Sequence, residues 1–136
     1  MRRAHRAAAL AAVMALAVAG AGCGDGTPKF CDSLARQADM GRLSAALNAN
    51  DLPRARREAS RFSQLAESAP DDVRPDLKAL AAGVADVVGI LEADKAGGDP
   101  AALERQREEL NTRLAELGRR STSVTTWASR ECGIDL

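Results

Sequence analysis

Breaks marked by proline and glycine divide the chain after residue 27 into four segments, and this division constrains the fold more than any other feature. Pro28 opens the first segment, and later breaks lie at 48–53, 69–72 and 97–100. Proline is favoured in the first turn of a helix, and glycine just beyond its end. The chain has two Phe, one Trp and no Tyr, and few aromatic residues favour helix over sheet. The four segments are therefore predicted to be helices.

Apolar residues recur at helical spacing in these segments. The stripe of the third segment consists of Val73, Leu77, Leu80, Val84, Val87 and Leu91. That of the fourth consists of Leu103, Leu110, Leu114, Leu117, Val124 and Ala128, with Arg107 and Ser121 interrupting it. Such spacing predicts one buried face on each helix. We expect one long fourth helix from Pro100 to about Arg130, and a bend near Gly41 in the first.

Short connections make consecutive helices antiparallel, so the sequence predicts an all-α fold, an up-down-up-down four-helix bundle at residues 29–136. This topology brings Cys31 and Cys132 to the same end of the bundle. We predict that they form a disulfide between the first and last helices, with Phe30 and Trp127 packed beside it. The alternative is a pair of free thiols in a redox or metal site, which the absence of CxxC spacing and of any histidine after His5 disfavours.

The amino terminus has the three-part layout of a secretory signal. Three arginines lie within the first six residues, an apolar run occupies 7–19, and small residues follow up to Cys23. The run is shorter than the roughly 20 residues that cross a bilayer as a helix. We therefore predict a signal peptide at 1–22, a flexible tether at 23–28 and export of the remainder. Loss of the three arginines leaves this remainder mildly acidic, so no nucleic-acid partner is expected.

The sequence Ala19-Gly20-Ala21-Gly22-Cys23 resembles the lipobox of bacterial lipoproteins, although Gly20 stands where a large aliphatic residue is usual. The resemblance implies a diacylglyceryl group on Cys23 and attachment to the outer face of the cytoplasmic membrane. Two acyl chains hold a protein on a membrane stably, whereas one holds it only marginally. The alternative is an ordinary signal peptide cut nearby, with Cys23 as a free thiol.

Most of the chain after the signal loosely resembles small exported helical lipoproteins of actinobacterial type. The resemblance lies in Phe30-Cys31-Asp32, in the stretch 45–53 and on to Ala69-Pro70, and in Trp127 through Glu131-Cys132-Gly133. It implies export, a helical bundle and a disulfide, and it implies no reaction.

Residues that could carry catalysis are scarce. After the signal the chain has no histidine and no tyrosine, which removes the usual general bases. Asp71, Asp72 and Asp76 cluster at the start of the third helix, where interaction with the helix dipole explains them better than a metal or acid–base pair. We predict neither catalytic residues nor a cofactor or metal.

The second segment carries an arginine-rich stretch. Arg54, Arg57 and Arg61 share a face by helical spacing and are candidates to contact anionic lipid headgroups or an acidic partner. The alternative is an ordinary helix surface on which Glu58 pairs with Arg54 and Arg61.

The sequence thus favours a lipid-anchored envelope bundle with a binding or structural role, with another envelope protein as a candidate partner, and leaves its oligomeric state open. An enzyme that uses carboxylates alone and an inert spacer are the alternatives.

Overall fold

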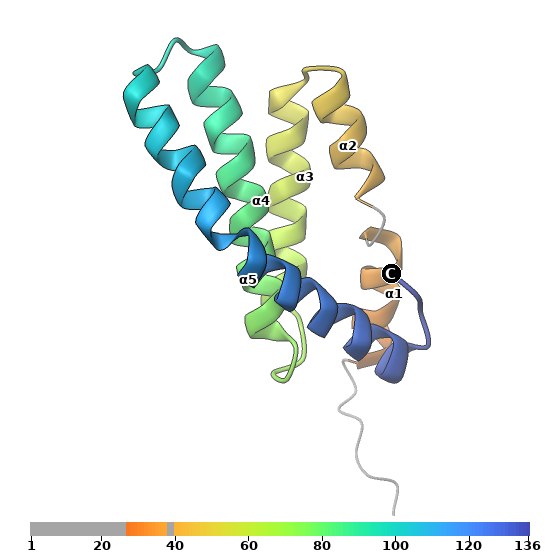
Figure 1. Ribbon diagram of the computed structural model, residues 1–136. Helices are drawn as coiled ribbons and strands as arrows, with labels where there is room; N and C mark the ends of the chain where they lie inside the picture. Colours follow the sequence, from red (N-terminus) through yellow and green to blue (C-terminus); the bar gives the residue numbers. More distant parts are fainter. Residues whose placement is uncertain (1–26, 38–39) are drawn as a thin grey trace, which may run out of the picture.

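The computed structural model describes residues 27–37 and 40–136, and these form helices and connecting turns without strands. The helices are α1 (Thr27–Gln37), α2 (Gly41–Asn48), α3 (Leu52–Glu67), α4 (Arg74–Lys95) and α5 (Pro100–Cys132). α1 and α2 follow each other along one side of the molecule, α3 descends, α4 ascends and α5 descends obliquely across the front (Figure 1). The predicted all-α fold with antiparallel order is confirmed.

The first predicted helix is divided into α1 and α2 near the expected bend. α2 begins at Gly41, and Met40 before it adopts a left-handed backbone conformation with a φ of 49°, which a residue inside a continuous helix does not adopt. α1 begins at Thr27, so the last two residues of the predicted tether belong to a helix. The predicted signal peptide and Cys23 lie outside the described residues.

The other helix boundaries follow the predicted breaks. The Asp51 side chain accepts a hydrogen bond from the backbone N–H of Arg54 and caps α3. The Asp99 side chain accepts bonds from the N–H groups of Ala101 and Ala102 and caps α5. Both helices have proline in the first turn, where the missing N–H costs no helical hydrogen bond. α5 continues to Cys132 as one helix, two residues beyond the predicted end.

The core consists of two clusters of buried apolar side chains. The first lies at the disulfide end and draws residues from α1, α3, α4 and α5, with Leu34, Leu77 and Trp127 among them. The second joins α2, α3 and α4 through small residues such as Ala46, Ala55 and Ala59. No residue of α5 belongs to the second cluster. α5 therefore joins these clusters only through its carboxyl-terminal part, and its buried Leu103 lies outside both.

The predicted disulfide is present. Cys31 and Cys132 are bonded, with their Cα atoms 5.4 Å apart and a sequence separation of 101 residues. Phe30 and Trp127 pack edge to face beside the bond, with ring centroids 5.7 Å apart. The buried Trp127 ring donates its Nε1 hydrogen to Asp72 Oδ2 over 2.9 Å, because an indole N–H withdrawn from water needs an acceptor. These contacts fasten the end of α5 to α1 and to the start of α4.

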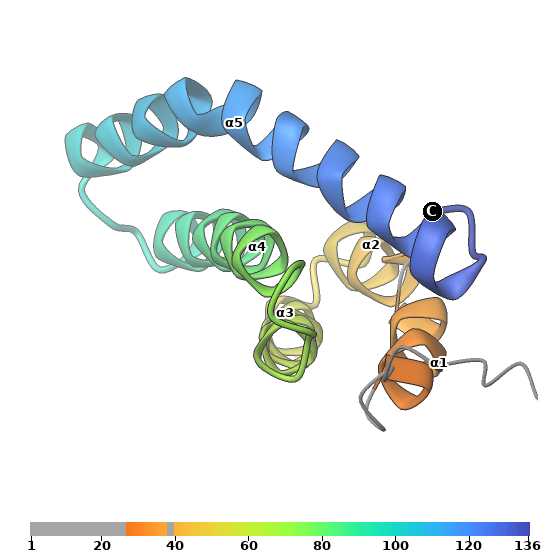
Figure 2. The same cartoon turned by 90° about the horizontal axis from the view of Figure 1, so that it is seen from below.

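The predicted apolar stripes of α4 and α5 are buried only in part, which corrects the expectation of one closed face on each helix. Val73 and Leu77 are fully buried, whereas Val87 and Leu91 are 37% and 39% exposed. On α5, Leu103, Val124 and Ala128 are buried, but Leu114 is 55% exposed. α5 passes over α4 at an angle and continues toward α1 (Figure 2). Val87, Leu91 and Leu114 are therefore left partly uncovered.

Replacing both Cys31 and Cys132 by serine is expected to lower the free energy of unfolding by about 2–5 kcal/mol, because a long closed loop constrains the unfolded chain. Urea denaturation followed by circular dichroism measures the loss. Reductant should destabilise the wild-type protein to a similar extent and leave the double variant unchanged. A wild-type protein indifferent to reductant would contradict the expectation.

Asp72→Ala removes the acceptor of the Trp127 indole and is expected to destabilise the protein by about 1 kcal/mol. Asp71→Ala is the matched control, since Asp71 is an adjacent exposed carboxylate that pairs only locally with Arg74, and it should cost less than about 0.5 kcal/mol. Chemical denaturation compares the two, with emission of the single tryptophan as the probe. Equal losses of unfolding free energy in the two variants would show that the hydrogen bond between Trp127 and Asp72 makes no specific contribution to stability.

Candidate functional site

An apolar groove lies between α4 and α5 and is bounded at one end by the carboxyl-terminal part of α1. Its volume is about 440 Å³, within the range of ~300–1,000 Å³ typical of small-molecule sites. The residues that line it come from every helix except α2 and from the segments that flank α1 and α5: Leu34, Gln37, Met40, Phe62, Leu77, Leu80, Gly83, Val84, Val87, Leu110, Leu114, Leu117, Ser121, Val124, Thr125 and Leu136.

The lining is almost wholly aliphatic. Gln37, Ser121 and Thr125 supply the polar side chains, and no charged side chain lines the groove. Leu114 on α5 and Val87 on α4 stand at its opening, where both are exposed. The groove is thus suited to an apolar ligand or an apolar segment of a partner.

Gly83 sets how closely α4 and α5 approach beside the groove. A Cβ atom added there would lie 2.9 Å from Leu117 Cδ1, closer than side-chain atoms normally come. The missing side chain lets Leu117 lie against the backbone of α4. This contact forms part of the groove wall.

Polar contacts hold α5 to α4 along a line separate from the groove lining. Each pairs a residue of α5 with an aspartate on or just before α4, in antiparallel order: Arg107 with Asp94 (3.6 Å), Arg113 with Asp86 (2.8 Å), Arg120 with Asp76 (2.8 Å) and Trp127 with Asp72 (2.9 Å). We call this series the polar ladder. The ladder fixes the register of the two helices without filling the space between their apolar stripes.

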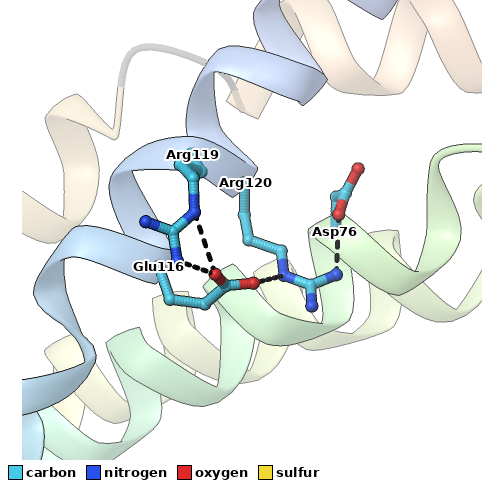
Figure 3. A network of polar contacts seen from close by, with 4 residues as sticks. All are labelled: Asp76, Glu116, Arg119 and Arg120. Carbon is cyan, nitrogen blue, oxygen red and sulfur yellow. Dashed lines mark hydrogen bonds and ion pairs between the residues drawn. The ribbon is translucent and has the colours of Figure 1, made fainter.

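Arg120 is the most connected member of the polar ladder (Figure 3). Its guanidinium donates to Asp76 and also to Glu116 on α5, each over 2.8 Å. Hydrogen bonds to Asp76 and then to Glu116 raise the pKa of Arg120 above its usual value. Arg119, which also donates to Glu116, and then Arg120 lower the pKa of that carboxyl. Both shifts favour the charged forms of Glu116 and Arg120.

The aspartates that cluster at the start of the third predicted helix point to different partners. Asp71 pairs with Arg74, Asp72 accepts from Trp127, and Asp76 pairs with Arg120. Within the part of the chain that the structure describes, no group of three or more His, Cys, Asp or Glu residues is placed to hold a metal ion. Asp72 and Asp76 join the start of α4 to the carboxyl-terminal half of α5, a role that their clustering did not reveal.

The arginines predicted to share a face of α3 are all exposed. Arg61 pairs with Glu58 over 2.9 Å, as the alternative interpretation expected. Arg54 and Arg57 make no side-chain ion pair with any described residue, and Arg56 pairs with Glu92 on α4. The use of this face by a partner or by headgroups stays a prediction.

A smaller hollow of about 170 Å³ adjoins the groove and is rich in arginine. Gln37, Met40 and Phe62 line both. The remaining residues of the hollow are Arg36, Arg42, Leu43, Glu58 and Arg61. We call it the arginine hollow. Sequence reasoning identified Arg61 but missed Arg36 and Arg42, because these lie on α1 and α2 and meet α3 only in the folded chain.

Among the described helices, none has both the length and the apolar character needed to cross a bilayer. Comparison with protein-family models, with curated proteins and with solved structures finds no match to this chain.

Proposed function

We propose that this chain is a lipid-anchored protein of the cell envelope whose helical bundle binds an apolar ligand in the groove between α4 and α5. The groove carries the proposal, because it is an open, aliphatic-lined space of about 440 Å³. Among the described residues, the exposed large apolar side chains other than Leu91 all line it: Val87, Leu114 and Leu136. Binding would remove this surface from water, and that burial is the main favourable term in association.

The amino-terminal sequence supports the location. The arginines, the apolar run and Cys23 resemble a lipoprotein signal. A disulfide is typical of exported proteins and rare in the cytosol, and the bond between Cys31 and Cys132 fits that pattern. Export and lipid attachment rest on these two features.

Binding is favoured over catalysis by the chemistry of the lining. Acid–base and nucleophilic mechanisms need ionisable or nucleophilic side chains within reach of the substrate. The groove presents two hydroxyls, one amide and otherwise apolar groups. A ligand held there would be retained by contact area and shape.

Lipid attachment is tested by mass spectrometry of the natively expressed protein. We expect cleavage before Cys23, a diacylglyceryl adduct on that residue, and a mass lower by two hydrogens for the Cys31–Cys132 bond. Cys23→Ser should abolish the adduct and release the protein from its membrane fraction or stop its processing. An unmodified mature protein free of the membrane would overturn the location.

Ligand binding in the groove is tested by photolabelling with a small neutral reagent, trifluoromethyl phenyl diazirine. We expect label on the α4 and α5 peptides that line the groove, reduced severalfold by Leu114→Glu, which places a charge at the opening. Leu91→Glu is the matched control, since Leu91 is exposed but lies outside the lining. Equal labelling in both variants would contradict a role for the groove.

A further inference from the structure

We propose that the natural ligand is a single-chain lipid with an anionic head, of which a long-chain fatty acid is the simplest. Its acyl chain lies in the groove and its head in the arginine hollow. This inference rests on the proposed function, since it names the ligand of the same groove.

The first argument is the size of the groove. A cavity of ~150 Å³ lined by apolar side chains binds benzene, so a groove of about 440 Å³ has room for roughly three times as many carbons, about 18. That is one long acyl chain. A phospholipid would have to leave its second chain in water or in the bilayer. The groove therefore selects for one chain.

The second argument is the charge beside the groove. In the arginine hollow, Arg36, Arg42 and Arg61 face the single carboxylate of Glu58. Asp39 lies outside the described residues, and counting it with Glu58 still leaves the arginines in the majority. Guanidinium groups bind carboxylate and phosphate through two parallel N–H donors. An anionic head at this place meets complementary charge.

The third argument is that donors in the hollow are free to take a ligand. Arg61 is engaged with Glu58, but Arg36 donates only to the hydroxyl of Ser33, over 3.1 Å. Arg42 makes no side-chain hydrogen bond or ion pair with any described residue. Two guanidinium groups on α1 and α2 therefore lack a carboxylate partner within the described structure. Because both are exposed, a ligand head reaches them without displacing an existing ion pair.

The fourth argument is that the groove and the arginine hollow are adjacent. Gln37, Met40 and Phe62 line the groove on one side and the arginine hollow on the other. An anionic head placed beyond these three residues meets the arginines of the hollow. The α4 and α5 residues of the groove lining offer a ligand only apolar groups and two hydroxyls. An amphiphile satisfies both environments, and a purely apolar ligand satisfies one.

The test uses the natively expressed protein in the fraction where it resides, labelled with palmitate that carries a diazirine within its chain. The matched neutral probe is the methyl ester of the same compound. We expect palmitate to label groove peptides of α4 and α5, with unlabelled palmitate competing, and the ester to label them several times less. Equal labelling by acid and ester would overturn the role of the anionic head.

Substitutions separate the arginine hollow from general surface charge. Arg36→Gln combined with Arg42→Gln should lower palmitate labelling about three- to tenfold, as expected for partly exposed hydrogen bonds to a charged group, and should leave ester labelling unchanged. Arg54→Gln combined with Arg57→Gln removes the same charge from α3 at positions outside the groove and the arginine hollow. This double variant should have little effect on palmitate labelling. Circular dichroism verifies that each variant is folded. An equal loss of palmitate labelling in the two double variants would show that palmitate is attracted only to a basic surface, and it would overturn the inference.

The outcomes also distinguish this inference from the proposed function. Labelling of the groove by the small neutral diazirine without labelling by palmitate would overturn the anionic lipid and leave an apolar ligand site standing. Absence of labelling by either reagent, together with a dimer in cross-linking, would show that a second copy covers the groove and would overturn both.

Discussion

The bond between Cys31 and Cys132 is the constraint on which the arrangement of the helices depends. α5 has 33 residues and α4 has 22, which correspond to lengths of about 50 Å and 33 Å. A short turn fixes the start of α5 beside the end of α4, and the disulfide fixes its other end beside α1. A helix held at both places cannot lie along α4 throughout. α5 therefore crosses the bundle obliquely, and the groove is the space left beside the crossing.

The interface between α4 and α5 is formed by two kinds of contact with different roles. The polar ladder sets the register, and apolar contacts close the interface at its two ends, through Leu103 at one and Val124 and Ala128 at the other. Exposed ion pairs contribute little stability individually, up to about 1 kcal/mol. The oblique course of α5 over α4 thus depends mainly on the fastened ends. A groove built this way exists without a ligand, which lowers the ordering cost of binding.

Sequence reasoning identified the helices, their order and the disulfide because each rests on local or topological rules. Proline and glycine placed the helix boundaries, and an even number of antiparallel segments brought Cys31 and Cys132 together. It could not identify the groove, since the spacing of Val87 or Leu114 is the same whether a neighbouring helix covers the residue or not. Arg107 and Ser121, which interrupt the stripe of α5, were the local signs of incomplete burial, and Ser121 lines the groove. The arginine hollow depends on the contact of α1, α2 and α3, which no single stretch encodes.

The proposed lipid anchor would hold the arginine hollow close enough to the membrane for the proposed ligand to come from it. The four residues from Cys23 to Thr27 span at most about 14 Å when extended, and Arg36 lies about 14 Å further along α1. An anchored bundle therefore keeps the arginine hollow within about 30 Å of the membrane surface, close enough for repeated contact with it. A single-chain anionic lipid that leaves such a surface would meet arginine donors and an aliphatic groove on the same protein. The short connection between anchor and α1 thus favours exchange with the membrane over capture from distant solution.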